Sequence, residues 1–301
     1  MNTEQANNSY NKAIYKEIMD NPLPPMTLRI GVAGHRDLSE VDMKRLREEI
    51  EETYEGIYKA VQFIATDDTD DIAKSIYAKN TTPVIRIISS LAEGADRLCI
   101  PDKVPFEYEL ACILPFPATK FIRGFSPGKS ITNPELDSVT EFYAILERIG
   151  YYRKGRHGYY NRNAPVIELD GNSANHDEAY NNCSRLLVEH SDILIAVYDG
   201  NIDKDVGTAV AVKAAMQKGI PVIHISTLDT TRKLHCSNRF GHAPNDHTPL
   251  TKDLLLTELR RVLLFSDIFE QSKTDYSEAL KNACTFSGAS DCSWKSSDPY
   301  R

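Results

Sequence analysis

The sequence predicts an α/β protein with a doubly wound, mainly parallel sheet and helices on both faces. Strand-length apolar runs alternate with amphipathic helical segments along residues 26–226, a pattern typical of parallel strands joined by crossover helices. Glycine, hydroxyl-bearing or charged residues follow the apolar runs where strands should end. The chain has 301 residues, of which 41% are hydrophobic, so it is long enough to bury a core of this kind.

The first predicted strand begins at Leu28 and opens into a loop around Gly34. Ser39 is expected to cap a long helix, because apolar residues then recur at helical spacing along residues 46–64. An acidic cluster interrupts this pattern, and residues 67–80 are interpreted as a surface excursion or short helix. A strand followed at once by a helix is the unit from which parallel sheets are built.

The middle of the chain continues the alternation of strands and helices. Asn133 is followed by a proline, a favourable combination of cap and first helical residue, and predicts a helix that extends to about residue 149. Another helix is expected at residues 175–190. Apolar runs predict strands at residues 83–88, 108–114 and 166–169.

The carboxyl-terminal half contains the clearest buried strand, at residues 192–200, because its centre is entirely aliphatic and aromatic. A helix of small residues is predicted at 207–218, and Gly219 is expected to end it. Residues 220–225 are interpreted as the last strand. The polar segment 227–251 then leads to a final helix.

Composition divides the chain into four regions. Residues 1–25 predict an amino-terminal helix with a linker, and residues 26–226 form the main α/β domain. Residues 227–272 are interpreted as a polar loop and carboxyl-terminal helix. Residues 273–301 are rich in serine, aspartate and lysine and are interpreted as a tail or linker.

Charge and cysteine content limit the class of protein. The formal net charge of −8 argues against binding to duplex nucleic acid. The six cysteines include no Cys-x-x-Cys pair, and three of them fall within apolar patterns, so a reducing compartment is expected. The sequence shows no signal-peptide pattern and no membrane-length apolar stretch, and a soluble, cytoplasmic protein is therefore expected.

Four groups of residues that suit ligand binding follow predicted strand ends. Glycine lets the backbone approach a ligand, and peptide N–H and guanidinium groups donate hydrogen bonds to phosphate oxygens. Because the carboxyl ends of parallel strands meet at one edge of a sheet, these groups are expected to form one pocket. The candidate ligand-binding residues are Gly31, Gly34, His35, Arg36, Ser89, Ser90, Leu91, Glu93, Gly94, Asp96, Pro115, Phe116, Asp199, Gly200, Gly207 and Thr208.

Individual roles follow from the chemistry of these side chains. His35 and Arg36 are interpreted as phosphate donors rather than catalysts. Glu93 would repel a phosphate, so it is an acceptor for a ribose hydroxyl, a helix-cap partner or a catalytic carboxylate. Gly207 and Thr208 begin a helix, which favours either phosphate binding or simple close packing of that helix on the sheet.

Three motifs stand out, at residues 29–36 (RIGVAGHR), 89–96 (SSLAEGAD) and 191–209 with the strand entry that begins at Gly219. Together they resemble the Smf/DprA and LOG superfamily, called SLOG, and especially its prokaryotic sensor domains related to the amino-terminal region of TRPM channels. The resemblance covers residues 26–226. It implies a Rossmann-like fold that binds a nucleotide-derived second messenger, such as ADP-ribose or a cyclic nucleotide. It also implies, as in several bacterial members, a sensor for anti-phage (antiviral) defence.

The sequence departs from the resembled enzymes in one loop. LOG enzymes hydrolyse nucleotide monophosphates and carry a Pro-Gly-Gly-x-Gly-Thr loop, with a glutamate three residues past the threonine. Here residues 203–205 are Asp-Lys-Asp where that loop has Pro-Gly-Gly, and Ala211 stands at the glutamate position. The departure disfavours hydrolysis. Related sensors often carry a membrane-spanning or nuclease region, so either an effector partner supplies the output or the chain is a fragment.

Three functions remain open at this level. The first is a non-enzymatic sensor that needs no cofactor, binds a nucleotide-derived ligand, and signals as a homo-oligomer or to an effector. The second is an enzyme that hydrolyses or transfers an N-glycosidic bond, with Glu93 or Asp199 as its carboxylate. The third is an assembly module with a vestigial pocket.

Two further segments are interpreted as surface features. His235, Cys236, His242 and His247 lie close in sequence, but their spacing matches no common zinc finger, so no metal site is assigned. Residues 151–160 mix aromatic and basic side chains, and they are interpreted as a lid over the pocket rather than a site for single-stranded nucleic acid.

Overall fold

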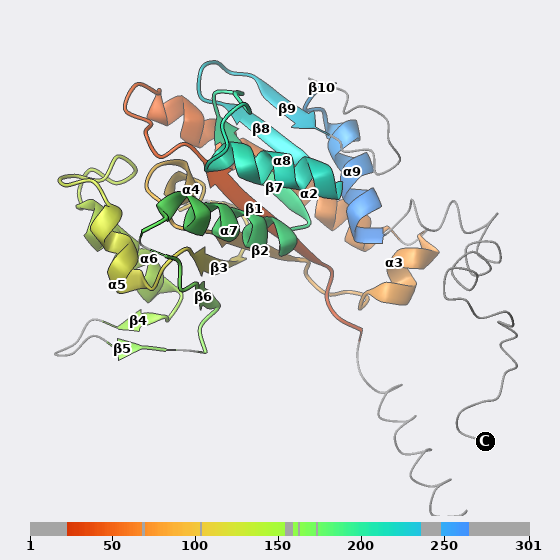
Figure 1. The fold of residues 1–301 in the computed structure, drawn as a ribbon. Helices are drawn as coiled ribbons and strands as arrows, with labels where there is room; N and C mark the ends of the chain where they lie inside the picture. The colour runs from red at the N-terminus through yellow and green to blue at the C-terminus, as the bar shows by residue number, and fades with distance from the viewer. Residues whose placement is uncertain are drawn as a thin grey trace, which may run out of the picture.

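An eight-stranded sheet forms the centre of the computed structural model (Figure 1). The strand order is β10-β9-β8-β7-β1-β2-β3-β6; the strands from β8 to β6 run parallel, while β9 and β10 are antiparallel additions at one edge. The predicted α/β fold with a mainly parallel sheet is confirmed. Its strands are β1 (Thr27–Gly34), β2 (Val84–Ser89), β3 (Tyr108–Leu114), β6 (Val166–Glu168), β7 (Ile193–Tyr198), β8 (Val222–Ser226), β9 (Arg232–His235) and β10 (Thr248–Pro249).

The structure describes most of the predicted α/β domain and part of the region on its carboxyl-terminal side. The amino-terminal helix and the tail predicted from the sequence lie outside the described residues. The described residues are 23–67, 70–102, 104–153, 159–161, 163–172, 174–235 and 248–264.

Helices cover both faces of the sheet, as predicted (Figure 1). On one face, α2 (Met43–Thr66), α6 (Ser138–Arg148) and α9 (Lys252–Leu264) pack over the larger apolar core. On the other face, α7 (His176–Glu189) and α8 (Thr208–Lys218) pack over a smaller one. All six residues of β7 are buried because this central strand is covered on both faces.

Shorter elements fill the connections. The four-residue helix α4 matters most for function, because it follows β2 at the carboxyl edge of the sheet. The short elements are α3 (Asp71–Ile76), α4 (Ala95–Leu98), α5 (Ala118–Phe121), the 3-10 helix η1 (Ile122–Gly124) and the separate hairpin strands β4 (Tyr152–Arg153) and β5 (Tyr159–Tyr160).

Two predicted helix starts are wrong, and carboxylate caps explain both. Helix α2 is capped by Asp42 rather than Ser39, because the Asp42 side chain accepts hydrogen bonds from two backbone N–H groups of the first turn. Helix α6 begins after Asp137 rather than at Asn133, since Asp137 makes the same pair of bonds. By contrast, α7 begins next to residue 175 and Gly219 ends α8, as predicted; Asn175 is the cap of α7, and Gly219 has the left-handed conformation.

The prediction that residues 220–225 form the last strand is also wrong. The polar segment after β8 turns back at once, with the N–H of Ser226 donating to the carbonyl of Thr231, and continues as β9. Strand β10 then pairs with β9 at the sheet edge. Edge strands need few apolar residues because solvent and charged side chains cover their outer side, so hydropathy did not reveal them.

The order in which strands are added to the sheet reverses at β1. From β1 the chain proceeds through β2, β3 and β6 on one side, and it then crosses to β7 and β8 on the other side. In open α/β sheets, the carboxyl ends of the strands at such a reversal leave a crevice that helices do not fill. The topology therefore predicts a crevice between the carboxyl ends of β1, β2 and β7. Within the described residues, no helix combines the length and hydropathy needed to span a membrane.

Candidate functional site

A cavity of about 300 Å³ lies at the reversal point, and we call it the strand-edge cavity. It is bounded by the end of β1, the loop that follows β2, helix α4, helix α7 and the start of α8. All three sequence motifs contribute to it. The predicted site residues that line it are Gly34, Arg36, Ser90, Asp96, Gly207 and Thr208.

Arg36 supplies the positive charge of the strand-edge cavity. Its guanidinium carbon lies 5.3 Å from the centre of the Tyr180 ring, a cation–π contact. Within the part of the chain that the structure describes, the Arg36 side chain forms no hydrogen bond and no ion pair. Its donors are therefore available to an anionic ligand.

Asp96 is the buried acidic group of the cavity, and it joins the motifs together. The Ser90 hydroxyl donates a hydrogen bond to its carboxylate, and backbone groups of Ala92 and Gly34 also hydrogen-bond to it. Burial raises the pKa of Asp96 to about 6, although these hydrogen bonds and the nearby charge of Arg36 oppose the rise. The carboxylate therefore fixes the geometry of the cavity wall and is protonated more readily than an ordinary aspartate.

The loop between β2 and α4 is held from its other side by Arg97. The Arg97 Nε donates to the carbonyl of Leu91 at 3.0 Å, and the Ser89 hydroxyl donates to the carbonyl of Asp96 at 3.0 Å. Leu91 has a positive φ of 55°, which a leucine adopts only where its surroundings enforce it. Leu91 is fully buried, so its role here is to shape the loop rather than to touch a ligand.

Two glycines of the motifs serve different purposes. Gly94 has a φ of 81°, and a Cβ atom there would lie 2.2 Å from the carbonyl oxygen of Arg36, so close backbone packing requires glycine. Gly207 has a φ of 65°, but a Cβ atom there would meet nothing within 4 Å. The space above Gly207 is thus open at the start of α8, where the first N–H groups lack helical partners and no side chain caps them.

Helix α7 supplies an apolar wall that the sequence analysis did not assign to the site. Asp177, Tyr180 and Ser184 line the cavity from one face of α7, and their spacing of three and four residues was the available signal. A helix face carries no strand-end signal, so the sequence pattern did not distinguish these residues from an ordinary solvent-exposed or packed face. The apolar and small lining residues are Cys183 and Leu187 on α7, with Val206 before α8 and Ala211 on α8.

Glu93 lies outside the strand-edge cavity. Its carboxylate accepts hydrogen bonds from the Ser138 hydroxyl at 2.6 Å and from the Ser126 backbone N–H at 2.8 Å. Both contacts tie the β2–α4 loop to the segment around α6. The sequence left three roles open for Glu93. Its contact with Ser138 agrees best with the role of a helix-cap partner, because Ser138 is the first residue of α6.

His35 and Asp199 form a pair beside the cavity rather than in its lining. The His35 Nε2 lies 3.6 Å from the Asp199 carboxylate, and the His35 ring meets the Tyr198 ring edge-on. Burial lowers the pKa of His35, while Asp199 opposes this. Burial also raises the pKa of Tyr198 to about 12. At neutral pH the pair is therefore mainly a neutral imidazole beside a carboxylate.

The remaining predicted residues lie near the cavity but do not line it. Phe116 packs edge-on against Tyr180 and borders a smaller neighbouring cavity of about 180 Å³, which also includes Lys120 and Arg123. The other predicted residues outside the lining are Gly31, Ser89, Leu91, Gly94, Pro115 and Gly200.

No group of three or more metal-ligating side chains gathers among the residues that the structure describes. Of the four His and Cys residues considered for zinc, only His235 lies within the described residues, where it is buried in β9. The hairpin β4–β5 includes part of the segment interpreted as a lid, and residues 154–158 of that segment lie outside the described residues.

In comparisons with known proteins, no family model and no curated protein matches this chain.

Proposed function

We propose that this protein is a sensor whose strand-edge cavity binds a nucleotide-derived ligand. The observation that carries the proposal is the convergence of three separate strand-end motifs on one cavity at the reversal point of a parallel sheet. These motifs are far apart in sequence. The packing requirements of a single turn therefore do not explain why all three carry small and polar residues. The resemblance of the same motifs to sensor domains supports a signalling role.

The chemistry of the cavity suits a phosphate at one end. Arg36 provides a guanidinium without a competing ion pair in the described structure, and the start of α8 provides backbone N–H groups. Arg36 is exposed, which screens its charge, so its contribution is one charged hydrogen-bonding partner rather than a deeply buried anchor.

The aromatic and apolar lining of the same cavity suits a flat, weakly polar group such as a base. Tyr180 offers an aromatic face, and Leu187 and Ala211 offer apolar contact. The volume of about 300 Å³ is at the lower end of the range for small-molecule sites, about 300–1,000 Å³. We therefore propose a ligand with one nucleotide unit inside this cavity.

Binding without turnover is the form of the proposal that the geometry favours. The carboxylates assigned to an N-glycosidic enzyme, Glu93 and Asp199, do not line the cavity, and Ala211 places no acidic group there. Two aspartates do line it: the Asp96 carboxylate is engaged by Ser90 and by the backbone, and Asp177 lies in the first turn of α7.

The proposal is tested by native mass spectrometry of the purified protein, followed by calorimetry with ADP-ribose, its cyclic variants and cyclic mononucleotides. A co-purifying nucleotide, or binding by one of these compounds, is expected. Arg36→Gln should weaken binding about tenfold, the effect of losing one charge-assisted hydrogen bond. Analytical ultracentrifugation with and without the bound compound then measures any change in oligomeric state.

Arg185→Gln is the matched control, because Arg185 is an exposed arginine of α7 that does not line the cavity. It should bind as the wild type does. Absence of binding across the panel, or equal affinity for wild type and Arg36→Gln, would contradict the proposal. Release of free base or ribose phosphate on long incubation would support the enzymatic alternative instead.

A further inference from the structure

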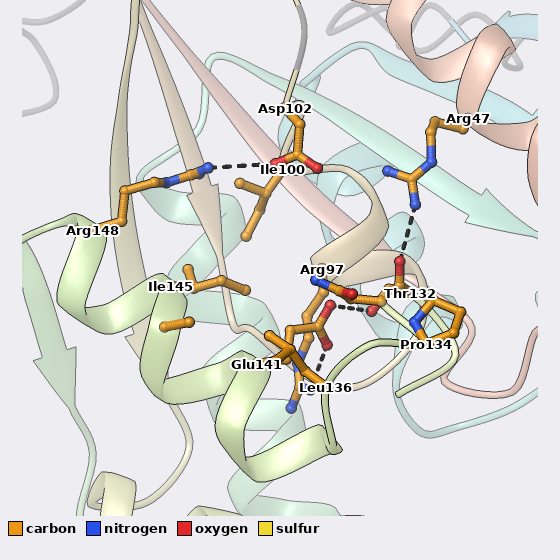
Figure 2. Close-up of a pocket in the computed structure, with 12 residues that line it drawn as sticks. Arg47, Arg97, Ile100, Asp102, Thr132, Pro134, Leu136, Glu141, Ile145 and Arg148 are labelled. Carbon is orange, nitrogen blue, oxygen red and sulfur yellow. Dashed lines mark hydrogen bonds and ion pairs between the residues drawn. The ribbon is translucent and has the colours of Figure 1, made fainter. Parts of the chain in front are cut away.

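A second cavity, of about 370 Å³, lies on the opposite side of α4 from Asp96, and we call it the helix cavity. It is bounded by α2, α4 with the loop after it, the segment before α6, and α6 itself. Figure 2 shows Arg47 and Arg148 reaching toward it from two different helices, with Arg97 and Glu141 at its base. It shares only α4 with the strand-edge cavity, and none of its lining residues belongs to the three sequence motifs.

The base of the helix cavity is a buried ion pair between Arg97 and Glu141. Within the described structure, the Arg97 Nη2 is buried without a hydrogen-bond partner. The Arg97 Nη1 donates to the Glu141 carboxylate at 2.9 Å, and the Arg97 side chain is fully buried. The remaining Glu141 acceptor positions take hydrogen bonds from Thr132 and Ser130, each at 2.6 Å. The guanidinium also lies 4.5 Å from the centre of the Phe125 ring. Glu141 therefore has little capacity left to repel or bind a ligand.

Arg47 brings a positive charge that no carboxylate balances within the described part of the chain. Its Nη2 donates to the carbonyl of Thr132 at 3.1 Å, which orients the guanidinium and leaves most of its donors unused (Figure 2). The Asn133 amide, which also lines the cavity, is a further donor close to this edge.

Arg148 holds its acidic partner only loosely. The distance from its Nη1 to the Asp102 carboxylate is 3.7 Å, and the Asp102 side chain is 74% exposed, so it is free to turn into solvent. The Arg148 Nη2 donates to the Tyr108 hydroxyl at 2.8 Å, which fixes the arginine in place. An anion between Arg47 and Arg148 would thus meet two oriented guanidinium groups at the cost of one weak, exposed ion pair.

Apolar side chains form the rest of the lining. Ile100, Pro134, Leu136, Ala144 and Ile145 surround the basic groups. A site that combines a cationic edge with apolar walls recognises an organic anion with an apolar body better than a bare inorganic ion.

We propose that the helix cavity is a second binding site, which takes a small organic anion whose phosphate or carboxylate lies between Arg47 and Arg148. The proposal does not depend on the ligand of the strand-edge cavity. It rests on the arrangement of Arg47 and Arg148 around a cavity whose base is the buried Arg97–Glu141 pair.

The test uses the full chain with phenyl phosphate and benzoate as organic anions, and with phenol and inorganic phosphate as matched compounds that lack the charge or the ring. Methyl signals of isoleucine in NMR spectra report the location, because Ile100 and Ile145 line the helix cavity and no isoleucine lines the strand-edge cavity. At least one organic anion is expected to bind in the millimolar range, more tightly than phenol or inorganic phosphate, and to shift both signals. The tighter of the two anions shows whether phosphate or carboxylate is preferred.

Arg47→Gln and Arg148→Gln should each weaken this binding about tenfold. Neither side chain is buried, so both variants should fold, which circular dichroism checks. Arg36→Gln, which changes the strand-edge cavity only, should bind the anion as the wild type does. The proposal is overturned if neither anion binds, if phenol binds equally well, if both arginine variants bind unchanged, or if Arg36→Gln abolishes binding.

Discussion

Arg36 and Arg97 lie on opposite sides of the loop between β2 and α4, and their surroundings differ in almost every respect. Arg97 is fully buried, paired with Glu141, bonded to the Leu91 carbonyl and packed against Phe125. Arg36 is exposed and contacts only an aromatic ring through its guanidinium in the described structure. A buried charge must be compensated within the fold, whereas an exposed one remains available to a ligand. The comparison assigns a structural role to Arg97 and agrees with the binding role proposed for Arg36.

The largest expected effect is on Arg97. Arg97→Met should lower the free energy of unfolding by about 3–5 kcal/mol, because it leaves the buried Glu141 carboxylate without its charge partner. Urea denaturation followed by circular dichroism measures this. The double variant Arg97→Met/Glu141→Gln should recover part of the loss, since no buried charge then remains unpaired. If Arg97→Met lowered the free energy of unfolding by less than about 1 kcal/mol, Arg97 would not differ from Arg36 in its contribution to stability.

Asp96 lies between the two arginines and is buried on α4. A variant of this residue shows whether burial changes the stability contribution of an acidic side chain as well as that of a basic one. Because burial raises its pKa to about 6, the folded protein holds this proton more tightly than the unfolded chain. The contribution of Asp96 to stability is therefore greatest below the ordinary carboxyl range and falls as the pH rises to about 6. The free energy of unfolding of the wild type should therefore fall by about 2–3 kcal/mol over this pH range, and Asp96→Asn should remove that fall.

The measurement for Asp96 is the difference in unfolding free energy between wild type and Asp96→Asn, followed from pH 4 to pH 8 in steps of about one unit. The free energy of unfolding of Asp96→Asn should increase relative to that of the wild type as the pH rises. A difference that does not change with pH would show that Asp96 titrates as an ordinary exposed carboxylate.

Arg36 should have almost no effect on stability. Arg36→Gln should change the free energy of unfolding by less than about 0.5 kcal/mol, because the described structure gives this side chain no hydrogen bond to lose. Thermal denaturation of wild type and variant side by side measures this. A loss comparable with that of Arg97→Met would assign Arg36 to the fold and weaken the case for binding.

The smallest expected effect concerns the His35–Asp199 pair. Asp199→Asn should lower the pKa of His35 further, because it removes the carboxylate that opposes the effect of burial. Proton NMR titration of the imidazole measures this. The folded state already disfavours the charged imidazole, so stability from this group declines as the pH falls below about 6.5, and the variant should show a steeper decline. An unchanged pKa would mean that solvent screens the pair completely.

The regular part of the fold could be predicted because its signals are local. The aliphatic run in β7, the small-residue helix before Gly219 and the Asn175 cap each depend on a few neighbouring residues. Strands β9 and β10 could not be predicted in this way, because an edge strand is defined by the partner it pairs with rather than by its own hydropathy.

The candidate site, like the fold, could be predicted only in part from the sequence. Topology rules bring strand ends to one edge, so Gly34, Arg36 and Gly207 could be expected to meet. Which carboxylate enters the cavity could not be derived, since Glu93 and Asp96 are three residues apart on one short loop. The orientation of that loop depends on Arg97, which bonds to Leu91 from α4.

The α/β class, the order of most elements and the three motifs at strand ends can be predicted from the sequence, because periodicity and glycine placement depend on neighbouring residues. Tertiary packing is needed to explain why Asp96 faces the strand-edge cavity while Arg97, the next residue, faces the helix cavity. Adjacent side chains on a helix point about 100° apart, so a single short helix separates two environments. Which environment each side chain enters is set by packing against distant segments, and that information is not local to the chain.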